Sequence, residues 1–214
     1  MSNIKIIYKK TINIICIILL FFLFSNICLA ETEDNISSKI KKCAACHTLN
    51  GNSITPIWPK IAEQHSDYLL KQLLEYKKGK QGNRFDPTMF SMLQELNEND
   101  MTQLAEYFSK QTLEKSKIKF NESAFAYGKN LYLYGDKNNK IIGCVGCHGI
   151  DATGNKLANF PNLKWQHKEY IILQLKKFQT HERSNDMNYI MQDIVINMSN
   201  EQIDALATYI SCIE

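Results

Sequence analysis

The chain has 214 residues, with 25 Lys and Arg, 22 Asp and Glu, and a formal net charge of +3 at pH 7. The first 30 residues hold three of the lysines and none of the acids, so the rest of the chain carries 22 residues of each sign. Neither the charge balance nor any basic stripe interleaved with aromatic residues indicates a nucleic-acid-binding surface, so we expect no nucleic-acid partner.

The N-terminal residues have a pattern typical of an export signal. Three lysines lead into an apolar run from Ile12 to Phe24 that only Asn13 interrupts, and Ala30 precedes the acidic Glu31. This pattern predicts a signal peptide over residues 1–30, cleaved after Ala30, and therefore a periplasmic protein. The alternative is a retained membrane anchor, although the unbroken apolar core of 11 residues is short of the roughly 20 that span a bilayer.

Two Cys-x-x-Cys-His runs follow, at residues 43–47 and 144–148. This pentapeptide is the attachment site of a c-type haem, in which two thiols add to the vinyl groups of the porphyrin and the imidazole reaches the iron. The sequence therefore predicts two covalently bound haem c groups. The predicted attachment residues are Cys43, Cys46, Cys144 and Cys147, and the predicted axial iron ligands are His47 and His148.

The two halves of the chain repeat each other. Tyr68 and Gln72 recur 102 residues later as Tyr170 and Gln174, and the haem motifs recur at 101. Such a repeat indicates two copies of one fold. We expect an all-α protein with two tandem haem-binding domains, over residues 31–112 and 122–214, joined by a polar linker over 113–121.

Each half contains helical patterns and no convincing strand. Apolar spacing predicts helices over Ser66 to Lys78, with Ser66 as N-cap, and over His167 to Phe178. Closing helices are expected after Asn97 and Ser199, the latter with Gln202 completing a capping box. Opening helices are expected over 34–42 in the first half and 123–133 in the second.

The repeat also selects a second axial ligand for each iron. The candidates are several methionines and histidines, namely Met89, Met92, Met101, Met187, Met191, Met198, His65, His167 and His181. At an offset of 102, only Met89 falls on another methionine, Met191. The others exchange with apolar residues, as core methionines do. We therefore predict Met89 and Met191 as the axial ligands.

His65 and His167 are the rival pair, because they too are 102 residues apart. Each follows its motif histidine too closely for the chain to reach the far face of the porphyrin, so we expect a capping or surface role. Pro59 and Pro161 also repeat, and we expect a backbone carbonyl beside each motif imidazole to accept its second N–H.

Two further features carry weaker hypotheses. Lysines cluster at 39–42 and 77–80, which indicates solvated faces or, alternatively, a docking patch for an acidic redox partner. Cys212 has no partner cysteine outside the signal peptide and the haem motifs, and we expect it to pack in the last helix.

Taken with the haem motifs, the methionine segments, the run Asn159 to Leu163 and the Leu-Ala-x-Tyr endings, the chain resembles the cytochrome c4 family. The resemblance covers residues 31–214. It implies two tandem class I cytochrome c domains in a pseudo-twofold pair. The pair is expected to carry electrons from a cytochrome bc1-type, quinol-oxidising donor to a terminal oxidase. Peripheral association with the membrane is an open alternative. The chain departs from the family pattern where His47-Thr48 replaces the His-Gly start that His148-Gly149 keeps.

Two classes of function remain open: an electron carrier with no catalytic residues beyond the haems, and a dihaem redox enzyme of peroxidase or thiosulfate-oxidising type. A cytochrome subunit of a membrane oxidase is a third possibility. An enzyme needs an open iron position or an unusual ligand such as Cys. Neither half shows one in place of its methionine, which favours the carrier.

Overall fold

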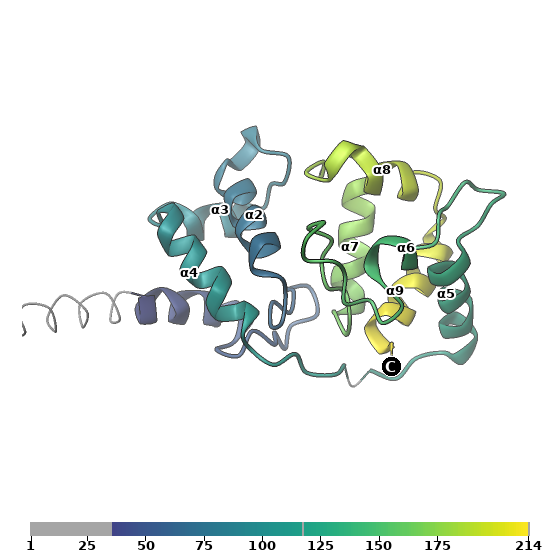
Figure 1. The fold of residues 1–214 in the computed structure, drawn as a ribbon, viewed down its shortest axis with the longest axis horizontal. Coiled ribbons are helices and arrows are strands. Elements are labelled where there is room, and N and C mark those ends of the chain that lie inside the picture. Colours follow the sequence, from purple (N-terminus) through teal and green to yellow (C-terminus); the bar gives the residue numbers. More distant parts are fainter. Residues whose placement is uncertain (1–35, 117, 214) are drawn as a thin grey trace, which may run out of the picture. The chain divides into compact units, whose positions relative to one another are not determined.

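The computed structural model describes residues 36–116 and 118–213 (Figure 1). The predicted signal peptide, with its cleavage after Ala30, lies outside these residues. Lys41–Glu214 forms one compact unit, and the contacts described below lie within it. No helix in the described ranges is long and apolar enough to cross a bilayer.

The prediction of an all-α fold is confirmed. The described residues contain no β-strand, and their only bridges are isolated pairs such as Arg84 with Arg183. The first half has a helix over 36–47, then α2 (Ser66–Lys77), a 3-10 turn η1 (Gly79–Gln81), α3 (Pro87–Leu93) and α4 (Glu98–Ser109). The second half has α5 (Glu122–Tyr134), α6 (Val145–His148), α7 (Lys168–Gln179), a 3-10 turn η2 (Met187–Tyr189), α8 (Ile190–Val195) and α9 (Asn200–Cys212).

The last helix of each half, α4 or α9, begins directly after its predicted N-cap residue, Asn97 or Ser199. Ser199 accepts from the N–H of Gln202, whose side chain returns the bond, so the capping box of α9 is confirmed. Asn97 and Asp100 form the same box at α4. The prediction of Ser66 as N-cap of α2 is wrong by one residue, because the first intrahelical bond runs from the N–H of Leu69 to the carbonyl of His65.

The opening helix of the first half is longer than predicted. We expected it to end at residue 42, but it continues through the first haem motif to residue 47. Ala44 and Ala45, which favour helix, fill the motif here, whereas the second motif has Val145 and Gly146. In the second half the short helix α6 begins anew after the loop that follows α5.

The core of the second half forms where α5 crosses α9 (Figure 1). Tyr132 is fully buried and its ring packs at 5.2 Å from that of Tyr209. Gly128 allows this close approach, because a Cβ added there would lie 2.0 Å from the carbonyl oxygen of Ala205. In the first half α2 packs against α4, whose buried residues include Met101, Leu104 and Phe108. Cys212 is buried in α9, as predicted.

Replacing Gly128 by alanine should therefore destabilise the second half. The overpacking costs about 3 kcal/mol, which outweighs the gain of about 1 kcal/mol in helix propensity. We expect the free energy of unfolding of the holoprotein, measured by denaturant titration, to fall by about 2 kcal/mol. Gly146→Ala is the matched control, because a Cβ there meets nothing within 4 Å. Equal effects of the two substitutions would contradict this account of the crossing.

Candidate haem sites

Both Cys-x-x-Cys-His runs fold into helical turns. In the second, the N–H of His148 donates to the carbonyl of Cys144 at 2.9 Å. The first is the last turn of the helix over 36–47, which the bond from the N–H of Thr48 to the carbonyl of Ala44 extends. Residues three and four apart share one helix face, so each turn presents two thiols and an imidazole to the same side.

The motif cysteines are available for attachment. None of the cysteines in the described part of the chain forms a disulfide. Burial raises the pKa of Cys43 to about 11 and that of Cys144 to about 12, so both are neutral thiols at pH 7. Thioether formation with a porphyrin leaves no charge to bury, so these positions fit a covalently attached haem.

The motif imidazoles have one nitrogen engaged. Nδ1 of His47 donates to the carbonyl of Pro59 at 2.9 Å, and Nδ1 of His148 donates to that of Pro161 at 3.1 Å. The predicted carbonyl beside each imidazole is thus confirmed. Because a carbonyl only accepts, the proton lies on Nδ1 and the lone pair on Nε2. Burial lowers the pKa of both imidazoles, while the proline carbonyls oppose this. The neutral ring that results is the form that binds iron.

The two predicted methionine ligands are anchored alike. The N–H of Met89, in α3, donates to Oδ1 of Asp86 at 3.0 Å. The N–H of Met191, in α8, donates to Oδ2 of Asp186 at 2.8 Å. Both methionine side chains belong to half-buried residues. An aspartate therefore fixes the backbone from which each thioether extends.

The other methionines are placed differently. Met101 and Met198 are buried in the two cores, whereas Met92 and Met187 are 41% and 54% exposed. These positions agree with the expectation that such methionines exchange with ordinary apolar residues. They leave Met89 and Met191 as the repeated, half-buried pair.

The aspartate anchors were not predicted from the sequence. Asp86 and Asp186 are 100 residues apart, whereas the methionines are 102 apart, so a search at one offset misses them. The second half has two more residues between its aspartate and its methionine. Asn188 and Tyr189, both at positive φ, accommodate this extra length.

A cluster of buried polar side chains was also missed. Arg84 and Arg183 are 4% and 6% exposed, and their backbones form an isolated antiparallel bridge. Their guanidinium groups donate to neutral oxygens on both halves of the chain, from Tyr68, Gln72, Tyr170, Gln174 and Asn185. Of these residues, only Tyr68, Gln72, Tyr170 and Gln174 stood out in the sequence, as members of the repeat.

This cluster fits haem as well. Arginine stays protonated in proteins, and the acceptors of both guanidinium groups in the described residues are uncharged. Nε of Arg84 is buried without a hydrogen-bond partner. Buried cations are stabilised by anions, and a haem brings two carboxylates. The thiols, imidazoles, thioethers and guanidinium groups together form a donor set suited to two haem c groups.

His65 and His167 occupy the N-cap positions of α2 and α7, but neither side chain makes a capping bond. Nε2 of His167 instead donates to the carbonyl of Ser53, in the other half, at 2.7 Å. The expectation of a capping or surface role is therefore wrong for His167, since its ring joins the two halves. Because Nε2 of His167 is bonded to this carbonyl, it is not free to bind iron, which disfavours His167 as an axial ligand.

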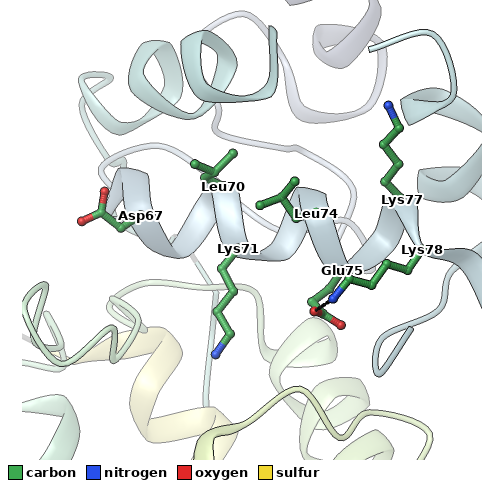
Figure 2. A pocket seen from close by; sticks show the side chains of 7 residues that line it. All are labelled: Asp67, Leu70, Lys71, Leu74, Glu75, Lys77 and Lys78. Carbon is green, nitrogen blue, oxygen red and sulfur yellow. Dashed lines mark hydrogen bonds and ion pairs between the residues drawn. The ribbon is translucent and has the colours of Figure 1, made fainter. Parts of the chain in front are cut away.

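The second lysine cluster lies at the C-terminal end of α2, where Lys77 is the last helical residue and Lys78 the C-cap, and Lys80 follows in η1. Lys78 forms an ion pair with Glu75 at 2.5 Å, and Lys77 donates to the carbonyl of Leu96. A cavity of about 700 Å³ lies beside this helix, with Leu70 and Leu74 as its apolar lining. Figure 2 shows these leucines on one side of α2 and Glu75 on the other. No motif cysteine or histidine lines the cavity. Lys77 and Lys78 are already engaged by Leu96 and Glu75, which favours a solvated face over a docking patch for an acidic redox partner.

Comparison with known proteins agrees with this geometry. The cytochrome c family model matches residues 38–112 and 125–213. Cytochrome c4 from Stutzerimonas stutzeri is 37% identical over 180 residues, covering 80% of this chain and 84% of that protein. A thiosulfate dehydrogenase electron acceptor from Thiomonas intermedia (strain K12) is 32% identical over 171 residues, covering 79% and 77%.

The fold is similar to that of solved relatives too. The crystal structure of reduced recombinant cytochrome c4 from Pseudomonas stutzeri matches with a TM-score of 0.80 at 34% identity, covering 85% of this chain and 98% of that one. The chain therefore consists of two tandem cytochrome c domains, and it carries two covalently bound haem c groups.

The two N-cap histidines, His65 and His167, should make stability depend on pH. Burial lowers the pKa of His167 and of His65 below the ordinary 6.5. Below pH 6.5 the unfolded chain then binds more protons, so stability is full above this pH and is lost as pH falls towards the depressed values. We expect His167→Gln, which retains a donor for the Ser53 carbonyl, to flatten this slope in denaturant titrations from about pH 7 to pH 5. An unchanged slope would contradict the assignment.

Proposed function

The chain belongs to the cytochrome c4 family, and from this we propose that it is a periplasmic carrier that takes electrons from a cytochrome bc1-type complex and delivers them to a terminal oxidase. The dihaem carrier type follows from family membership. The compartment rests on the predicted signal peptide, and the donor and acceptor rest on the resemblance. The domain limits 31–112 and 122–214 are likewise part of the proposal.

We assign one haem to Cys43 and Cys46, with His47 and Met89 as axial ligands. The other is assigned to Cys144 and Cys147, with His148 and Met191. The observation that supports this most is the duplicated arrangement in which a proline carbonyl holds each imidazole and an aspartate holds each methionine amide. When bound, each haem supplies an iron that alternates between the ferric and ferrous states.

Two protein ligands on each iron leave no coordination position for a substrate. Haem held by these residues would supply electron transfer and would not bind peroxide or thiosulfate at its iron. The role of the chain is then to fix the ligands, to keep the ligand set the same in both oxidation states and to exclude water. This is the physical reason for preferring a carrier to a dihaem enzyme.

A second candidate concerns the electron donor. The relative from Thiomonas intermedia is described as a thiosulfate dehydrogenase electron acceptor. A thiosulfate dehydrogenase is therefore the alternative donor for this chain, which would remain a carrier without thiosulfate-oxidising activity of its own.

The methionine assignment predicts a haem-selective loss. In Met89→Ala and Met191→Ala, one of the two irons should lose its low-spin methionine signal in magnetic circular dichroism. Its potential should fall by on the order of 0.1 V, because a thioether favours ferrous iron. Met92→Ala is the control, since Met92 is exposed on the same helix α3 as Met89. Bis-histidine spectra in the unsubstituted protein would refute the assignment.

The carrier assignment is tested with the purified holoprotein. Thiosulfate alone, or peroxide with a reduced dye, should give no catalytic turnover. A bc1-type complex supplied with quinol should reduce the protein, and a terminal oxidase should reoxidise it. Reduction only by a thiosulfate dehydrogenase with its substrate would favour the second donor. Turnover of thiosulfate by the protein alone would make it an enzyme.

A further inference from the structure

Two glutamine side chains clamp the backbone of the opposite half. Gln166 accepts from the N–H of Lys60 at 2.9 Å and donates to the carbonyl of the same residue at 2.8 Å. Gln64 accepts from the N–H of Asn162 at 2.9 Å and donates to its carbonyl at 2.8 Å. All four residues are buried, so these four bonds lie out of water.

Each clamp holds the peptide group that also holds a motif imidazole. The carbonyl of Pro59 and the N–H of Lys60 belong to one peptide: the carbonyl accepts from His47 and the N–H donates to Gln166. The peptide between Pro161 and Asn162 does the same for His148 and Gln64. A continuous chain of two hydrogen bonds thus runs from a glutamine of one half to an imidazole of the other.

The glutamines are themselves held in place. Oε1 of Gln166 also accepts from the N–H of His167 at 3.0 Å, and Oε1 of Gln64 from the N–H of His65 at 3.1 Å. These N–H groups belong to the N-cap residues of α7 and α2. The glutamine Oε1 that accepts from the clamped peptide is therefore also held by a backbone N–H at the start of a helix.

Hydrogen bonds in such a chain strengthen one another. A peptide whose N–H donates to an acceptor carries more negative charge on its oxygen, and each bond in such a chain strengthens the next by roughly 10–30%. That oxygen then pulls more strongly on the Nδ1 proton, and the imidazole becomes a more basic ligand. A more basic ligand stabilises ferric iron relative to ferrous iron.

We propose that Gln166 and Gln64 are positioning residues that tune, across the junction between the halves, the iron ligand of the opposite half. Gln166 lowers the potential of the haem attached at Cys43 and Cys46, and Gln64 that of the haem at Cys144 and Cys147. The inference rests on the proposed ligation by His47 and His148. It adds a link between the two sites that requires no contact between the cofactors.

The link is reciprocal by thermodynamic necessity. If the glutamine bond favours ferric iron in the opposite half, then oxidation of that iron strengthens the glutamine bond. Docking of the halves and the oxidation states of the irons are therefore coupled, and the carrier holds its halves together most tightly when both irons are ferric.

The test is a redox titration of Gln166→Leu and Gln64→Leu holoprotein, with the haems resolved by the paramagnetic NMR shifts of their methyl groups. Gln166→Leu should raise the potential of the haem at Cys43 and Cys46, by up to about tenfold in its ferric–ferrous equilibrium, or 59 mV. The other haem should move less. Gln64→Leu should give the opposite selectivity, and Gln→Ala variants replace any leucine variant that fails to fold.

A matched control loosens the same junction elsewhere. His167→Phe removes the 2.7 Å bond from Nε2 of His167 to the carbonyl of Ser53 in the other half and leaves both clamped peptides intact. It should shift neither haem selectively. An equal shift of both haems in the glutamine variants, or the same haem-selective shift in His167→Phe, would mean that loosening alone acts and would overturn the proposal.

A second readout follows the imidazole itself. In reduced Gln166→Leu the NMR resonance of the His47 Nδ1 proton should move in the direction of a weaker hydrogen bond, while that of His148 stays in place. A changed potential with an unmoved proton would also overturn the proposal. Failure of the ligand assignment is distinguished separately, because the spectra of the unsubstituted protein would then lack histidine–methionine ligation.

Discussion

The hydrogen bond from each motif imidazole to a proline carbonyl is the contact on which both sites depend. It fixes the tautomer, aims Nε2 away from the protein backbone and sets the basicity of the ring. The carbonyl must be held for this to work, and each half holds it in the same way. The N–H of Ile61 donates to the carbonyl of Gly51 at 2.8 Å, and that of Leu163 to the carbonyl of Ala152 at 2.8 Å. The loop after each motif is thus tied back on itself beside the imidazole.

The contacts that join the halves are mainly polar, and this suits a carrier. Side-chain amides, guanidinium groups and tyrosine hydroxyls meet with their partners largely satisfied, which specifies one register between the halves more strictly than apolar packing does. Arg84 and Arg183 bring two like charges to the same cluster. Their repulsion is offset by many short hydrogen bonds, and anionic groups of bound haem would offset it further.

The parts of the sites that could be predicted from the sequence are those in which residues occur at a fixed spacing. Porphyrin attachment fixes the spacing of the motifs, capping boxes have fixed spacing too, and the repeat identified the two prolines beside the imidazoles. Helices α3 and α8 have 7 and 6 residues, too few for an apolar period to stand out. Arg84 and Arg183 are separated by 99 residues and so disappear from a search at 102. His167 bonds to the backbone carbonyl of Ser53, and a backbone acceptor cannot be recognised from the type of residue in the sequence.

The changing offset itself shows what the fold preserves. It is 99 at the arginines, 100 at the aspartates and 102 at the methionines. The arginine hydrogen bonds and the bond from the methionine N–H to the aspartate nevertheless recur in both halves. The two extra residues of the second half lie where Asn188 and Tyr189 adopt left-handed backbone, which is unfavourable for tyrosine. This backbone conformation takes up the extra length and still allows the N–H of Met191 to bond to Asp186. Backbone length varies between the anchors, while the geometry at each anchor is kept, as the proposed ligation of two irons by Met89 and Met191 requires.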